Sequence, residues 1–188
     1  MLGSTAESDA SVSEVQSVPG FTEIVAPEQA ALSPSLVARR RGNDHRLYAI
    51  ADKGRVCAYG WVSGPGQEVR VLHALTFTVP PRCIYIWDCL TLPEERNRGR
   101  YKALLRGMLS TVPEAGTAYV AVDLGNTASR RALERVGFRP LFKYFGMKLF
   151  GSPVFALAYD DGRILRAQSA FDHIGTKAAG MDSVHGNA

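Results

Sequence analysis

Residues 90–105 read LTLPEERNRGRYKALL, and this stretch decides the fold because a strand ends and a helix begins within it. The apolar strand stops at Leu92, since Pro93 cannot donate a hydrogen bond to a neighbouring strand. Gly99 permits a tight backbone turn, after which a helix starts. The first amides of a helix have no partners inside it, and the helix dipole favours an anion there. The stretch therefore predicts an anion-binding loop between a strand and a helix.

Basic side chains are concentrated around this loop. They are Arg96, Arg98, Arg100, Lys102 and Arg106. Guanidinium groups bind phosphate oxygens through charge-assisted hydrogen bonds, so a pyrophosphate suits the loop. The formal net charge of the chain is only +4, which indicates a local anionic ligand rather than a basic surface. Because no aromatic ladder or known binding motif accompanies the basic residues, we expect no nucleic-acid partner.

The residues before the loop predict an antiparallel meander. Strands are expected at residues 21–25, 46–51, 55–62, 69–79 and 83–92. A helix is expected at 27–41, ending in a solvated run of arginines. The last strand is almost continuously apolar, which is typical of a strand covered on both faces. We therefore expect it in the middle of the sheet.

The residues after the loop alternate between helix and strand. A helix is expected at 99–109, a buried strand at 118–122, a second helix capped by Asn126 or Thr127, and a strand at 141–150. A strand-helix-strand crossover makes the two flanking strands parallel. The prediction is an α/β fold with a mixed central sheet, in which an antiparallel meander precedes strand-helix-strand-helix-strand, with helices on both faces.

The two ends of the chain are predicted to lie outside this domain. Residues 1–20 are small and polar and are expected to form a disordered tail. The domain is expected at 21–150. Residues 151–188 form a C-terminal extension with a short strand at 154–159, an amphipathic helix at 164–174 and a frayed end over the last dozen residues.

The bulk composition of the 188 residues excludes several classes of protein. No apolar run approaches the length of a membrane helix, so no membrane partner is expected. The N-terminus lacks the basic start and apolar stretch of a secretory signal. Three cysteines without metal-type spacing predict neither a disulfide framework nor a metal site. A reducing cytoplasm is the expected location.

The loop and a second block resemble the GNAT superfamily of acyl-CoA-dependent N-acyltransferases. The family's loop reads (Q/R)-x-x-G-x-(G/A), and Arg96-x-x-Gly99-x-Tyr101 matches its first two fixed positions. Tyr101 replaces the last small residue, as in one branch of the family. Asn126-Thr127-Ala128-Ser129, followed by Gly137-Phe138, is similar to the family's N-x-x-(A/S)…GF block. The resemblance covers about residues 46–150.

The resemblance implies a donor substrate and a set of residues that bind it. The donor is acetyl-CoA or another short acyl-CoA, with no metal. The backbone of the strand at 83–92 would pair with the acyl carbonyl and the pantetheine arm, the loop would hold the pyrophosphate, and Asn126 would hydrogen-bond toward the pantetheine. The implied residues are Cys89, Leu90, Thr91, Leu92, Arg96, Asn97, Arg98, Gly99, Arg100, Tyr101, Lys102 and Asn126.

The implied reaction is direct attack of an amine on the thioester in a ternary complex, with a small-molecule amine as the acceptor. The alternative is a non-catalytic acyl-CoA-binding sensor or partner module. The chain is expected to be a monomer or a homodimer.

The sequence does not decide which residues act as general base and general acid. Asp88, the one acid in the strand at 83–92, is either the general base or a structural residue that receives hydrogen bonds. Many relatives carry a tyrosine as general acid where this chain has Leu133, so Tyr144 and Tyr101 become the candidates, each with a structural role as the alternative. Tyr85 stands where one branch of the family has a catalytic glutamate.

Overall fold

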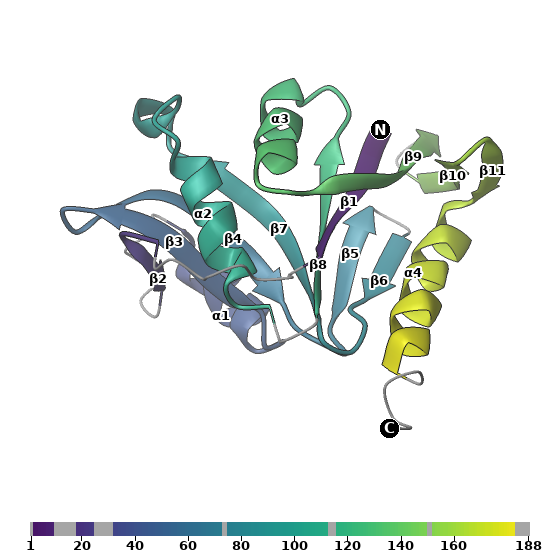
Figure 1. The fold of residues 1–188 in the computed structure, drawn as a ribbon, viewed down its shortest axis with the longest axis horizontal. Coiled ribbons are helices and arrows are strands. Elements are labelled where there is room, and N and C mark those ends of the chain that lie inside the picture. The colour runs from purple at the N-terminus through teal and green to yellow at the C-terminus, as the bar shows by residue number, and fades with distance from the viewer. Residues whose placement is uncertain are drawn as a thin grey trace.

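A nine-stranded mixed sheet forms the centre of the protein in a computed structural model (Figure 1). The model describes residues 2–9, 18–24, 32–72, 75–112, 116–149 and 152–182. The strand order is β11-β10-β9-β1-β8-β7-β4-β3-β2. These strands are β1 (Leu2–Asp9), β2 (Phe21–Glu23), β3 (Arg46–Asp52), β4 (Arg55–Ser63), β7 (Cys83–Thr91), β8 (Thr117–Asp123), β9 (Arg139–Leu149), β10 (Ser152–Asp160) and β11 (Arg163–Arg166). The α/β fold predicted from the sequence is confirmed.

Strand β7 lies in the middle of the sheet, as its apolar sequence predicts. It pairs antiparallel with β4 and parallel with β8. Its first four residues, Cys83 to Ile86, are buried. The hairpin of β3 and β4 is also confirmed, with Arg46 opposite Val62 and Asp52 opposite Arg55.

Residues 69–79 do not form one strand, which corrects the sequence analysis. They make a separate two-stranded sheet of β5 (Glu68–Leu72) and β6 (Leu75–Thr78). The buried side chains Val69, Leu75 and Phe77 belong to the same apolar cluster. Because the segment folds into two antiparallel strands, side chains from both strands reach that cluster. The alternation of apolar and polar residues has a period of two in either case, so it does not distinguish one long strand from two short ones.

The prediction of a disordered N-terminal tail is wrong for Leu2–Asp9. These residues form β1, which pairs antiparallel with β8 on one side and with β9 on the other. A strand between two others forms main-chain hydrogen bonds along both of its edges. Since this stabilisation does not depend on apolar side chains, the small and polar sequence of the segment gives no sign of it.

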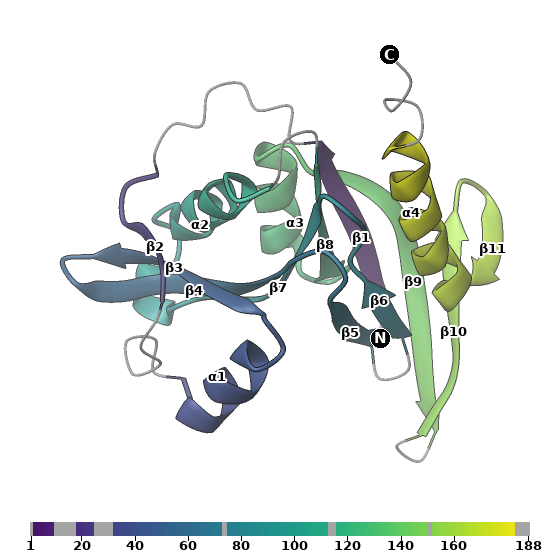
Figure 2. The same ribbon diagram turned by 90° about the horizontal axis from the view of Figure 1, so that it is seen from below.

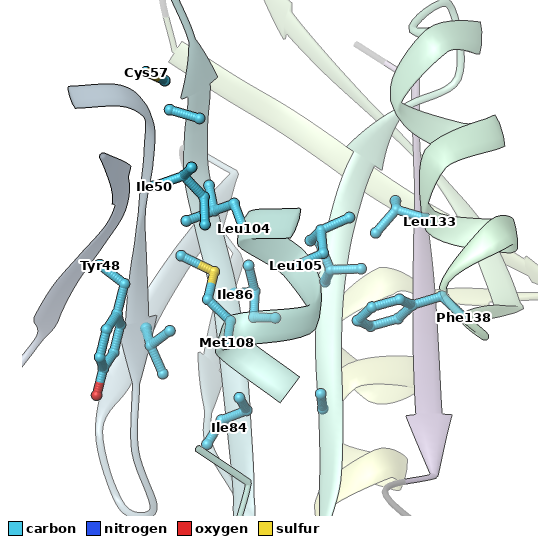
Figure 3. Packing of buried hydrophobic residues seen from close by; sticks show 14 residues of the cluster. Tyr48, Ile50, Cys57, Ile84, Ile86, Leu104, Leu105, Met108, Leu133 and Phe138 are labelled. Carbon is cyan, nitrogen blue, oxygen red and sulfur yellow. The ribbon is translucent and has the colours of Figure 1, made fainter. Parts of the chain in front are cut away.

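The helices cover both faces of the sheet. They are α1 (Pro34–Arg41), α2 (Arg100–Leu109), α3 (Thr127–Arg135) and α4 (Ala167–Asp182). One apolar cluster joins α2 and α3 to the sheet through Leu104, Leu105 and Leu133 (Figure 3). Helix α1 packs on the opposite face (Figure 2). Helix α4 packs there too, since Trp87 borders both the α1 cluster and the α4 cluster.

The sheet continues beyond residue 150. The strand predicted at 154–159 lies within β10, which pairs with β9. The helix predicted at 164–174 starts later, at Ala167, because Arg163–Arg166 pair with β10 as β11. Ala170 and Phe171 of α4 are buried against the sheet, so this part of the C-terminal extension packs on the core.

Candidate functional site

Strands β7 and β8 diverge halfway along their length. Their pairing covers only Cys83–Ile86 and Thr117–Val120. After Ile86, the edge of β7 that faces β8 has no strand partner among the described residues. Leu90 is 40% exposed there, although it lies in the middle of the sheet. An unpaired strand edge in this position can accept main-chain hydrogen bonds from a ligand.

One hydrogen bond shows which way the backbone N–H groups of β7 point near this edge. The Leu92 N–H donates to the carbonyl of Cys57 in β4, at 3.0 Å. Because N–H groups alternate in direction along a strand, those of Cys89 and Thr91 point the other way, toward β8. The backbone groups predicted to bind an acyl-CoA therefore face the point where the strands diverge.

A β-bulge lies at the same point. Trp61 pairs with Trp87 and Tyr59 pairs with Leu90, so β7 has one residue more than β4 between these pairs. Asp88 takes a left-handed backbone conformation with φ +46°, which is unfavourable for a residue with a side chain. The opposing residue is Gly60, where an added Cβ would lie 2.5 Å from the Cys89 Sγ.

Arg40 of α1 contacts the residues of the bulge. It does so on the face of the sheet that α2 does not cover. Its Nη1 donates to Asp88 Oδ2 at 2.5 Å. Its guanidinium carbon lies 4.4 Å from the ring centre of Trp87 and 4.9 Å from that of Trp61, a cation–π arrangement. The Arg40 side chain is only 19% exposed. The sequence predicts a solvated helix end for this arginine run, and it gives no sign of these contacts of Arg40.

The loop after β7 leads directly to the start of α2. Pro93–Glu95 form a 3₁₀ turn (η2), and Asn97 and Gly99 follow with φ +62° and +75°. No side chain caps α2 at Gly99. The first amides of α2 are therefore open to a ligand, and the positive end of the helix dipole is at the same place. This geometry fits the pyrophosphate predicted from the sequence.

The arginines of the loop have different roles. Arg100 donates to Glu95 Oε2 at 3.0 Å and to Asp52 Oδ2 at 2.5 Å, which ties the loop to the end of β3. The hydrogen bond from Arg100 lowers the pKa of Glu95. Arg98 lies 3.4 Å from the same carboxylate. Arg96 makes one long contact, at 3.5 Å, with the Thr91 carbonyl. Arg96 and Arg98 are exposed, while Arg100 mainly fixes the shape of the loop.

Helix α3 begins beside α2. The Asn126 Oδ1 accepts the Ser129 N–H at 3.1 Å, so the predicted cap is confirmed. This bond leaves the amide nitrogen of Asn126 as an exposed donor. Tyr101, in the first turn of α2, lies near Ser129 and the Cys89 thiol. Burial, and then Cys89, raise the pKa of Tyr101. The structure thus brings Cys89, Tyr101 and the start of α3 together.

Tyr144 packs in a different part of the protein. Its ring centre lies 5.6 Å from that of Phe171 of α4. Burial, with a smaller contribution from Asp123, raises the pKa of Tyr144 to about 12. Tyr85 is in the same cluster, and burial raises its pKa as well. Asp88 and Tyr144 therefore pack against different helices, Asp88 on α1 and Tyr144 on α4. Leu133 is buried in the α2–α3 cluster.

Cys89 is expected to be chemically inert. Burial, and then the charge of Asp88, raise the pKa of its thiol to about 12, so the thiol stays protonated at neutral pH and lacks the nucleophilic thiolate. Iodoacetamide should label Cys89 of the folded protein far more slowly than an unstructured cysteine peptide at pH 8, as followed by peptide mass spectrometry. Labelling at the rate of the free peptide would contradict the raised pKa of the thiol. Unfolding in urea, as the control, should restore that rate.

The described residues contain no group of three or more histidine, cysteine, aspartate or glutamate side chains arranged to hold a metal ion. No helix among them is both long and apolar enough to cross a membrane.

One family model and several solved structures are similar to this chain. A family model described as "Acetyltransferase (GNAT) family" matches residues 16–138. A putative acetyltransferase of that family from Novosphingobium aromaticivorans has a similar structure, with a TM-score of 0.51 and 20% identity over 76% of this chain and 62% of that one. An acetyltransferase of the family from Colwellia psychrerythraea gives 0.52 and 12%, over 74% and 52%. This chain thus spans less than two thirds of either protein. No relative among curated sequences matches it.

Proposed function

Because this chain belongs to the GNAT acetyltransferase family, we propose that it transfers an acetyl group from acetyl-CoA to the amine of a small molecule. The observation that carries the proposal is the unpaired edge of β7, which leads without interruption to the uncapped start of α2. A donor with a thioester, a chain of amides and a pyrophosphate matches these features in that order. The oligomeric state and the cytoplasmic location stay predictions from the sequence.

The binding residues follow from this geometry. The amides of Asn97 to Lys102 would hold the pyrophosphate at the positive end of α2. The backbone from Cys89 to Leu92 would pair with the amides of the pantetheine arm, as an added strand would. Asn126 would donate its free amide hydrogen to the same arm. When bound, acetyl-CoA supplies an activated acetyl group.

In this proposal the chain contributes to the reaction mainly by positioning the acyl group and the hydrogen-bond donor that faces its oxygen. The Cys89 N–H, which points toward β8, would donate to the acyl oxygen as negative charge develops on it. The Arg40 ion pair favours the structural role for Asp88 over that of general base. In this proposal, water at the exposed side of the bulge accepts the proton that the amine loses when its nitrogen bonds to the acyl carbon.

The pKa of Tyr144 argues against this residue as a general acid. The reaction breaks the carbon–sulfur bond and releases a thiolate, and an ordinary thiol has a pKa of about 8.5. A phenol whose pKa is about 12 keeps its proton in the presence of such a thiolate. Tyr101, whose pKa is also raised, is better suited to donate a hydrogen bond than a proton. In this proposal the thiolate leaves unaided and takes its proton from water.

The proposed function is tested by binding and turnover measured on the same sample. Acetyl-CoA should raise the melting temperature, because a ligand at a hundred times its dissociation constant stabilises the folded state by about 2.7 kcal/mol. A panel of small amines should then release free CoA, followed with a thiol reagent. If no acyl-CoA stabilises the protein, both the transferase and the binding module are excluded. Tight binding without turnover on any amine would instead favour the non-catalytic module. The buried Leu133, at the position of the general acid in many relatives, and the ion-paired Asp88 are also compatible with that module.

A further inference from the structure

Ser63 is the last residue of β4 and lies in the core, with an exposed fraction of 0%. It pairs with Tyr85 of β7, which precedes Asp88 by three strand residues, or about 10 Å. At this distance Ser63 does not touch the place where the acyl group is expected. Any effect of Ser63 on the proposed acetyl transfer must therefore pass through the residues that lie between them.

The hydroxyl oxygen of Ser63 accepts two hydrogen bonds. One comes from the indole Nε1–H of Trp87 at 2.8 Å, and an indole nitrogen can only donate. The other comes from the Nδ1 of His45, at 3.0 Å. This nitrogen carries a hydrogen, because it also lies 3.3 Å from the Gln67 Oε1, an oxygen that can only accept. Both acceptor positions of the Ser63 oxygen are therefore occupied, and one of them holds the ring of Trp87.

Aromatic rings enclose the indole of Trp87. The His45 ring meets it edge-on, with the ring centres 5.3 Å apart and the planes at 82°. The Trp61 ring packs beside it, with 5.9 Å between the ring centres. The indole N–H of Trp61 is also buried, but it has no hydrogen-bond partner in the part of the chain that the structure describes. Of these two tryptophans, only Trp87 is thus oriented by a hydrogen bond to Ser63.

The ring of Trp87 in turn supports the side chain of Arg40. The guanidinium carbon lies 4.4 Å from the centre of this ring, and such a contact is attractive because the ring face is electron-rich. The same guanidinium donates to Asp88, the residue of the bulge with φ +46°, at 2.5 Å. A continuous series of contacts therefore leads from the Ser63 oxygen to the backbone of the bulge.

We propose that Ser63 is a positioning residue for the acyl site. Its oxygen holds the Trp87 indole, and the indole keeps the Arg40 guanidinium against Asp88. The bulge then places the Cys89 N–H where the acyl oxygen is expected. This role rests on the proposed function, in which that N–H stabilises the negative charge that develops on the acyl oxygen. Without the Ser63 oxygen the buried indole N–H would lack an acceptor, so the ring would turn toward another one and release Arg40.

The first test is NMR of the ligand-free protein, which does not depend on turnover. Ser63→Ala should shift the backbone amide resonances of Asp88 and Cys89, in the same direction as Arg40→Met. Arg39→Met is the control and should leave both resonances in place, because Arg39 is the exposed neighbour of Arg40 in α1. Unchanged resonances in folded Ser63→Ala would overturn the proposal. If they shift but no amine is acetylated, the effect of Ser63 on the bulge stands and only the proposed function fails.

A second substitution keeps this test decisive if Ser63→Ala does not fold. Ser63→Cys has a similar shape, but its sulfur is only a weak hydrogen-bond acceptor. It should shift the amide resonances of Asp88 and Cys89 in the same direction, and its failure to do so would count against the proposal equally.

The second test uses double-mutant cycles in steady-state kinetics. Ser63→Ala should lower kcat about threefold to tenfold and leave the KM for acetyl-CoA nearly unchanged. In an Arg40→Met or a Trp87→Phe background it should have little further effect on kcat, because the contact through which it acts is already lost. In a Trp61→Phe background it should keep its full effect, since Trp61 makes no such hydrogen bond among the described residues. An equal loss of kcat in all backgrounds, or none in any, would overturn the proposal, whatever the change in melting temperature.

Discussion

Gly99→Asp should lower the affinity for acetyl-CoA by about a hundredfold, or about 2.8 kcal/mol, while the protein stays folded. Gly99 has φ +75° and precedes the first turn of α2. A Cβ there would meet no atom within 4 Å, so the fold accommodates the side chain. The left-handed backbone costs about 1–2 kcal/mol for a residue with a Cβ, and aspartate tolerates it better than most. The new carboxylate would lie where the pyrophosphate is expected and would repel it.

Gly162→Asp is the matched control for this substitution. Gly162 lies in the turn between β10 and β11, has φ +82° and also has nothing within 4 Å of an added Cβ. The two variants therefore share the backbone strain and the added charge but differ in position. Calorimetric titration with acetyl-CoA should show normal affinity for Gly162→Asp and a large loss for Gly99→Asp. Equal affinities would remove the loop from the binding site.

The donor side of the site could be predicted from the sequence because its determinants are local. Pro93 ends the strand, Gly99 allows the turn, and Asn126 caps the next helix, each through the conformation of its own residue or a neighbour. The central place of β7 follows from its own continuous apolar run. Such signals need no knowledge of which segments meet in space, and the structure confirms these elements.

Features that depend on distant contacts were missed for a physical reason. Arg40 is 48 residues from Asp88, and nothing near it in the sequence indicates that two tryptophans and a carboxylate will surround it. Strand β1 is held by backbone pairing to β8 and β9, which leaves no pattern in its side chains. Each of these is a property of the assembled fold.

Arg40→Met should lower kcat by about tenfold to a hundredfold and leave the KM for acetyl-CoA nearly unchanged. Asp88 holds a backbone conformation that costs about 1–3 kcal/mol, and its side chain, 52% exposed, has the Arg40 guanidinium as its ion-pair partner. Without that partner the bulge should relax and carry the Cys89 N–H away from the acyl oxygen. A displacement of about 1 Å at a reacting group can cost a hundredfold in rate. Steady-state kinetics with Arg39→Met as the control measures the effect.

Asp88→Gly then separates the two roles that the sequence left open for Asp88. Glycine adopts a positive φ without strain, so it keeps the bulge without help from Arg40. If Asp88 only shapes the bulge, Asp88→Gly should retain most of kcat, and Arg40→Met combined with Asp88→Gly should be faster than Arg40→Met alone. If Asp88 is the general base, Asp88→Gly should lose most of kcat and the double variant should recover nothing. Because a glycine at this position supplies the backbone conformation but no carboxylate, the rate of the double variant decides between a residue that positions Cys89 and one that takes the proton.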